Sequence, residues 1–103
     1  MSQLKLSIIR FVADDQPGIV ACQFSDAHGR LHTIIDKAPM FTRDPLDFSS
    51  AYPKPGAIRC EVLELSQDET GRNLARITLE RPDYVESTTF ISEFIVFAAQ
   101  IET

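Results

Sequence analysis

The feature that most constrains the fold is an apolar residue at every second position in several short segments. Near the N-terminus, Leu4, Leu6 and Ile8 alternate with polar side chains, and the segments 57–65 and 74–80 repeat this spacing. A period of two places alternate side chains on one face of a β-strand, whereas an amphipathic helix needs a period near 3.6. We therefore predict strands that begin at Leu4 and that cover Ile19–Phe24, Arg30–Lys37, Ala57–Leu65 and Leu74–Glu80.

Turn signals separate these strands. Asp15–Gly18, Asp26–Gly29 and Asp68–Gly71 each combine aspartate with glycine, and these residues favour tight reversals of the backbone. The apolar phase also changes after Ile8, because the next residue, Ile9, is apolar as well, and this predicts a bulge in the first strand. Strands joined by such short turns pair in an antiparallel manner.

The segment Thr89–Ile101 fits two kinds of secondary structure. Phe90, Phe94 and Phe97 would share one face of a helix, yet the many aromatic and β-branched residues favour a strand. We predict a strand with two apolar faces and keep the helix as the alternative. The chain then holds six strands, which predicts a single all-β domain over residues 1–103, a small six-stranded antiparallel barrel or sandwich with a long Pro-rich loop.

The net charge of −5 is distributed unevenly along the chain. Residues 1–56 contain six basic and six acidic side chains, whereas residues 57–103 contain four basic and nine acidic ones. An acidic surface repels phosphate backbones, so we predict that the protein binds no nucleic acid. The acidic second half is interpreted either as a solvated face or as a surface that docks a basic partner.

The segment Pro39–Gly56 is the candidate site. It carries four of the six prolines of the chain, and loops of this length within a compact domain are uncommon unless they are functional or disordered. Two interpretations remain open: a lid that packs onto one end of the barrel, or a preordered recognition loop that presents aromatic anchors to another protein. The predicted partner-binding residues are Met40, Phe41, Arg43, Phe48 and Tyr52.

The two cysteines are predicted to be reduced core residues. Cys22 and Cys60 alternate in phase with apolar neighbours, and two cysteines are too few for a disulfide scaffold. A bridge between them remains possible if their strands are neighbours. The longest uncharged apolar run, 94–99, is far shorter than a membrane-spanning helix, and we expect a cytoplasmic protein without a membrane contact.

No grouping of residues predicts catalysis, a bound metal or a cofactor. His28 and His32 with Asp26 and Asp36 are the only cluster of metal-ligand types, and no Cys-x-x-Cys or His-Glu-x-x-His pattern accompanies them. We interpret them as turn and surface residues. The chain also lacks a Gly-x-Ser-x-Gly nucleophile motif and a glycine-rich phosphate loop.

Several short motifs resemble those of small uncharacterised bacterial single-domain β-proteins. The motifs are Asp36-Lys37, Pro39, Tyr52-Pro53, Pro55-Gly56, Ile58, Cys60, Gly71-Arg72 and Glu86-Ser87. This resemblance covers most of the chain after residue 30 and implies no activity.

We hypothesise a non-enzymatic protein-binding module, for example a bacterial immunity or antagonist-type protein whose contact surface combines the Pro-rich loop with the acidic second half. The motivation is the aromatic loop, the one-sided acidity and the lack of catalytic motifs. One alternative is a homo-oligomeric structural protein in which the strand over residues 90–99 meets its own copy. Another is a small-ligand binder at the mouth of the barrel, which rests on architecture alone.

Overall fold

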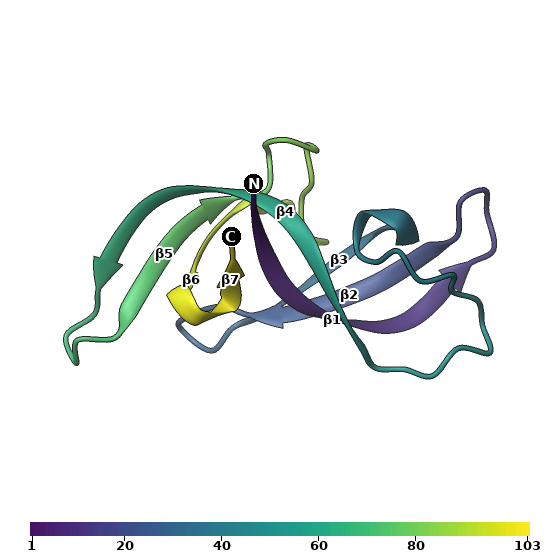
Figure 1. Cartoon of the computed structure of the whole chain (residues 1–103), viewed down its shortest axis with the longest axis horizontal. Coiled ribbons are helices and arrows are strands. Elements are labelled where there is room, and N and C mark those ends of the chain that lie inside the picture. The colour runs from purple at the N-terminus through teal and green to yellow at the C-terminus, as the bar shows by residue number, and fades with distance from the viewer.

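The computed structural model describes all residues from 1 to 103, and it consists of strands and two short helical turns (Figure 1). The strands are β1 (Ser2–Ala13), β2 (Ile19–Ser25), β3 (Leu31–Lys37), β4 (Lys54–Gln67), β5 (Asn73–Thr78), β6 (Glu93–Phe97) and β7 (Ile101–Glu102). The helical turns are η1 (Ala38–Met40) and η2 (Ala98–Gln100). Neither turn is long or apolar enough to cross a lipid bilayer.

The strands form one curled sheet in the order β3-β2-β1-β4-β5-β6, with β7 also paired to β1. Every pair is antiparallel, so the prediction of an all-β antiparallel fold is confirmed. The prediction of a closed six-stranded barrel is wrong, because β3 and β6 form no ladder with each other. Only two backbone hydrogen bonds cross the open side, from Thr88 N–H to the Thr33 carbonyl and from Ala27 N–H to the Ile95 carbonyl, both 2.8 Å long.

The curled sheet forms a half-barrel, and β4 connects its two parts, β1–β3 and β5–β6 (Figure 1). Its residues 54–60 pair with β1, and its residues 61–67 pair with β5. The register shifts between Val62 and Glu64, which marks a β-bulge, and bulges bend the strand that carries them. The bend turns β5 and β6 away from the plane of β1–β3, and the predicted bulge of β1 is confirmed by a register shift between Ile8 and Arg10.

The core lies on the concave side of the sheet. Leu4 and Ile8 of β1 are fully buried, as are Ile58 of β4 and Ile77 of β5, in agreement with the period-two pattern. Eighteen buried residues form a single hydrophobic cluster. The chain therefore folds around one core, as the spacing of its apolar residues indicates.

The segment after β3 is shorter than the predicted loop. β4 begins at Lys54, so Pro55 and Gly56 belong to a strand, opposite Ser7 and Leu6 of β1. A side chain at Gly56 would lie 2.9 Å from Ile8 Cδ1 and 3.0 Å from the Phe41 carbonyl oxygen. A larger residue at this position would therefore force Ile8 and the backbone at Phe41 to shift. Residues 38–53 form η1 followed by irregular backbone.

The C-terminal segment is neither one long strand nor one helix. Only Glu93–Phe97 is a strand, and η2 separates it from β7. One local and one long-range hydrogen bond of Gln100 hold this break: its side-chain oxygen accepts the Phe97 N–H at 2.9 Å, and its side-chain amide donates to the Ser25 carbonyl at 2.8 Å. These two bonds divert the chain away from β5 and over the end of β2.

Two turns of the sheet are stabilised in the same way, by an aspartate side chain that accepts backbone hydrogen bonds. The Asp26 and Asp68 side-chain oxygens accept hydrogen bonds from the backbone N–H groups two and four residues ahead, at 2.8 and 3.0 Å for Asp26 and at 2.9 Å each for Asp68. Gly29 and Gly71 adopt φ of +80° and +84°, a region that glycine enters without steric cost. The predictions of turns at both places are confirmed.

The prediction of two reduced, buried cysteines is confirmed. Cys22 and Cys60 are free and buried, and burial raises the pKa of Cys22 to about 12 and that of Cys60 to about 11. A bridge between them is excluded by register, because Cys22 lies opposite Ile8 of β1 and Cys60 lies opposite Ser2. Six residues along a strand span about 20 Å, far more than a disulfide can reach.

We expect neither thiol to react in the folded protein. At pH 8 the thiolate is almost absent from both groups, and both are covered by the core. A thiol assay with a disulfide reagent should therefore detect less than about a tenth of the thiols in the native protein and both of them in denaturant. Rapid labelling of the native protein would contradict the buried positions of Cys22 and Cys60.

Candidate functional site

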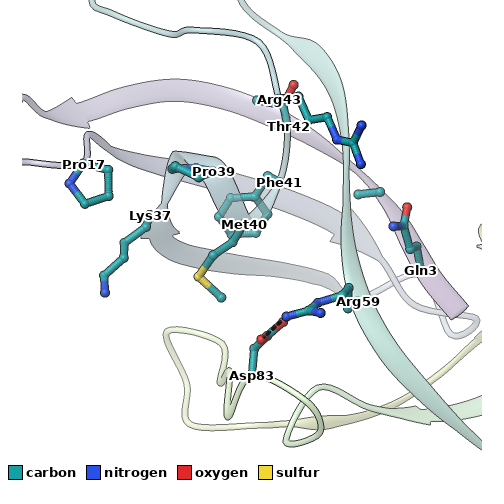
Figure 2. Close-up of a pocket in the computed structure, with 11 residues that line it drawn as sticks. Gln3, Pro17, Lys37, Pro39, Met40, Phe41, Thr42, Arg43, Arg59 and Asp83 are labelled. Carbon is teal, nitrogen blue, oxygen red and sulfur yellow. Dashed lines mark hydrogen bonds and ion pairs between the residues drawn. The ribbon is translucent and has the colours of Figure 1, made fainter. Parts of the chain in front are cut away.

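The candidate site is a surface groove of about 440 Å³ (Figure 2). One wall is the segment 37–43, which joins β3 to the irregular backbone that follows, and the other is formed by Gln3 of β1 and by Ala57 and Arg59 of β4. Asp83, from the connection between β5 and β6, closes one end. Pro17, from the turn between β1 and β2, also lines the groove, so five regions of the chain meet there.

The segment 37–43 is held in place from three sides. The Ala38 N–H donates to the Gly18 carbonyl at 2.9 Å, which ties η1 to the turn between β1 and β2. The Phe41 N–H donates to the Ala38 carbonyl at 3.0 Å, and the Phe41 carbonyl accepts the Ala57 N–H of β4 at 3.0 Å. The Phe41 side chain is buried in the core with 3% exposure. The wall of the groove is thus fixed before any partner arrives.

The electrostatics of the groove differ from those of the whole chain. Lys37, Arg43 and Arg59 are three cations, and Asp83 is the single anion among the lining residues, so the groove carries a charge of +2. Arg59 donates to both oxygens of Asp83, at 2.6 Å and 3.1 Å. Lys37 and Arg43 form no ion pair at all. The groove is a cationic site on a protein whose net charge is −5.

The structure brings together three of the five predicted partner-binding residues. Met40, Phe41 and Arg43 line the groove, although the Phe41 ring itself points into the core. Phe48 and Tyr52 are not among the lining residues. Phe48 is 65% exposed and meets the ring of Phe11 edge-on at 4.8 Å between centroids, whereas the Tyr52 hydroxyl donates to the Asp47 carbonyl at 2.8 Å.

The remaining lining residues were not predicted. Gln3, Arg59 and Asp83 lie on β1, on β4 and in a later loop, and no local motif connects them. Lys37 was named only as the last residue of a predicted strand and as part of the Asp36-Lys37 motif, not as a binding residue. Because ion pairs such as Arg59 with Asp83 join residues 24 positions apart, the sequence pattern contains no signal for them.

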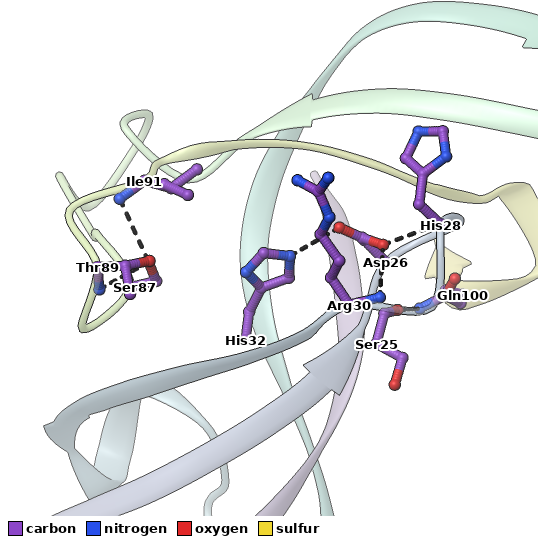
Figure 3. A network of polar contacts seen from close by, with 9 residues as sticks. All are labelled: Ser25, Asp26, His28, Arg30, His32, Ser87, Thr89, Ile91 and Gln100. Carbon is purple, nitrogen blue, oxygen red and sulfur yellow. Dashed lines mark hydrogen bonds and ion pairs between the residues drawn. The ribbon is translucent and has the colours of Figure 1, made fainter.

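Asp26 lies in the turn between β2 and β3 as interpreted, but the interpretation of His32 as a surface residue is wrong, because its side chain is largely buried on β3. His32 Nε2 lies 2.8 Å from Asp26 Oδ2, and both side chains are only 10% exposed (Figure 3). The imidazole is packed between Phe24 and Phe94, at centroid distances of 5.3 and 4.7 Å. Sequence spacing suggested no such pair, because the hairpin and β6 supply its surroundings jointly.

The contact with His32 helps to lower the pKa of the Asp26 carboxyl. Burial by itself would raise the pKa of this carboxyl, but the hydrogen bond with His32 and the backbone N–H groups of Arg30 and His28 outweigh burial and lower the pKa. No group of three or more histidine, cysteine, aspartate or glutamate side chains could hold a metal ion. We therefore assign the Asp26–His32 pair a structural role at the turn between β2 and β3.

Two aromatic residues in the connection between β5 and β6 are almost fully exposed. Tyr84 and Phe90 are 82% and 81% exposed and adopt φ of 56° and 65°. Bulky residues rarely occupy this left-handed region, and it costs free energy when they do. Tyr84 was not singled out from the sequence, Phe90 was considered only as part of the segment 89–101, and neither lines the groove.

The comparisons with known proteins place the chain in no group. No protein-family model, no curated protein and no solved structure matches it.

Proposed function

We propose that the protein is a non-enzymatic, protein-binding module of the cytoplasm and that the groove is its contact surface. The observation that carries the proposal is the wall 37–43, which is hydrogen-bonded to Gly18 and to Ala57 and anchored in the core by Phe41, while Met40 and Arg43 line an open groove. A preordered surface loses little conformational entropy on binding, and methionine and arginine are enriched in interfaces. The lining contains no histidine, cysteine or serine, and its one carboxylate, Asp83, is held in a bidentate contact with Arg59.

One concrete form of this proposal is an immunity or antagonist-type protein that covers a bacterial toxin. The second half of the chain supports it with a set of free carboxylates. All four arginines of residues 57–103 are paired with acidic side chains, which leaves Glu69, Glu80 and Glu86 without an ion pair. Such exposed carboxylates would attract a basic region of a partner and steer its approach.

The experiment compares partners captured by the immobilised wild-type chain with those captured by the double variant Met40→Ser and Arg43→Ser. We expect at least one protein to bind the wild type about tenfold more tightly than this variant, because an anchor and a charge are both removed. The matched control is Leu65→Ser with Arg30→Ser, which removes an exposed apolar residue and an unpaired arginine elsewhere. Equal capture by all three proteins would disprove the contact surface.

A second candidate function is self-association through the region before and within β6. Ile91 and Ile95 are both partly exposed, and Phe90 lies next to them in the chain with its ring almost fully in solvent. Light scattering coupled to size exclusion tests this candidate. A wild-type dimer that becomes a monomer in the double variant Phe90→Ser and Ile95→Ser would support self-association. A wild-type chain that stays monomeric at high concentration would disprove it.

A further inference from the structure

Unpaired cations are scarce in this protein, and two of them lie at the groove. Of the ten lysines and arginines, six form ion pairs with carboxylates. The four without an ion pair are Arg10, Arg30, Lys37 and Arg43. Lys37 and Arg43 stand within six residues of each other on the same wall. The groove therefore concentrates positive charge that has no counterpart inside the chain.

The space between these cations is apolar. Figure 2 shows Lys37 and Arg43 on opposite sides of Met40, with Pro39 beside it. On the opposite wall, Arg59 is already neutralised by its bidentate contact with Asp83. A ligand in the groove thus meets an apolar centre between two free cationic groups.

Resting on the proposed function, we infer that the groove binds an acidic segment of a protein partner. Carboxylates of this segment accept hydrogen bonds from Lys37 and Arg43, and an apolar side chain between them packs on Met40. Charge complementarity selects this occupant, because Lys37 and Arg43 have no ion-pair partner within the chain and a carboxylate of a partner can pair with each of them. The assignment concerns the ligand of the groove and is independent of the exposed carboxylates in the second half of the chain.

A peptide fits this site better than a nucleic acid does. A phosphate backbone needs a row of cations along its path, whereas the groove offers two free ones. The rest of the surface carries the acidic excess of a chain with net charge −5, which repels a polyanion that extends beyond the groove. A short acidic segment with apolar residues avoids this repulsion because its charge is local.

The test uses fluorescence anisotropy with a labelled synthetic peptide in which glutamate alternates with leucine. Two comparison probes are a peptide in which lysine replaces glutamate and a single-stranded oligodeoxythymidylate. The full-length wild-type chain is compared with the double variant Lys37→Gln and Arg43→Gln. Its matched control is Arg10→Gln with Arg30→Gln, which lowers the positive charge equally and removes the other two unpaired cations.

We expect the glutamate peptide to bind the wild type and the control variant equally and to bind the groove variant about tenfold more weakly, with affinity that falls as salt rises. The lysine peptide and the oligonucleotide should bind less tightly than the glutamate peptide. Absence of binding of the glutamate peptide, an equal loss in both variants, or tighter binding of the oligonucleotide would each overturn the inference. Equal thermal midpoints of the variants ensure that the loss is not unfolding.

This outcome is separable from that of the proposed function. If a captured partner depends on Met40 and Arg43 but the glutamate peptide does not bind, the protein-binding function stands and the acidic ligand is wrong. If the glutamate peptide binds in the groove but no captured protein depends on Met40 and Arg43, the class of ligand is correct. The proposed function as a protein-binding module is then wrong.

Discussion

Replacing Phe41 by alanine is expected to lower the free energy of unfolding by about 3–5 kcal/mol, the range for removing a buried phenylalanine ring. The Phe41 ring is 3% exposed and belongs to the core cluster. Its loss leaves a cavity directly beneath the wall of the groove. Because the Phe41 carbonyl also accepts the Ala57 N–H, the wall should loosen where it is tied to β4.

Urea denaturation followed by circular dichroism measures this effect, and Phe48→Ala is the matched control. Phe48 is largely exposed and has one edge-on contact, with Phe11, so its loss should cost about 1 kcal/mol. Equal costs for the two substitutions would contradict the assignment of Phe41 to the core. The Phe41 side chain therefore packs in the core beneath the groove wall. A test of partner contacts should replace Met40 and Arg43 instead, because these residues line the groove.

Replacing Asp26 by alanine is expected to lower the free energy of unfolding by about 2 kcal/mol, the cost of removing charge-assisted hydrogen bonds from a poorly exposed site. His32 Nε2 loses its partner at 2.8 Å. The N–H groups of His28 and Arg30 lose their acceptor as well, and the turn between β2 and β3 depends on them. Asp14→Ala is the control, because Asp14 is exposed and accepts no hydrogen bond.

The cost of Asp26→Ala should depend on pH in a defined direction. Burial raises the pKa of Asp26, but the hydrogen bonds from His32 and from two backbone N–H groups outweigh it, so the folded pKa lies below the ordinary value. A carboxyl of this kind stabilises the fold above its unfolded pKa of about 4, and this contribution is lost as the pH falls through the folded pKa.

The difference in unfolding free energy between wild type and Asp26→Ala should therefore be larger at about pH 5 than at about pH 2. Denaturation curves at both pH values measure it, and other aspartates contribute equally to both proteins. A difference that grows toward low pH would contradict the assigned direction of the pKa shift.

The strands and turns could be predicted because their causes are local. The alternation through Leu4, Leu6 and Ile8 places these side chains on one face of a strand wherever that strand lies. The turn at Asp68 likewise depends on its own neighbours, since its carboxylate binds the next residues of the chain. The burial of Cys22 and Cys60 follows from the same period.

The failed predictions have non-local causes. Thr89–Ile101 is broken because Gln100 reaches the carbonyl of Ser25, which is 75 positions away. The pairing of Asp26 with His32 is enclosed by Phe94 from a distant strand. Neither contact leaves a periodic signal, so propensity alone assigned a continuous strand and two isolated side chains.

The all-β class, the positions of most strands, the short turns and the identity of most buried apolar residues could be read from the sequence, because each of these depends on neighbours within a few positions. Only the tertiary structure decided that the sheet stays open and that a groove forms between β4 and η1. The bend in β4 sets where β5 and β6 lie, and this brings Asp83 to Arg59. Lys37 and Arg43 line the same groove, and neither forms an ion pair with a carboxylate of the chain.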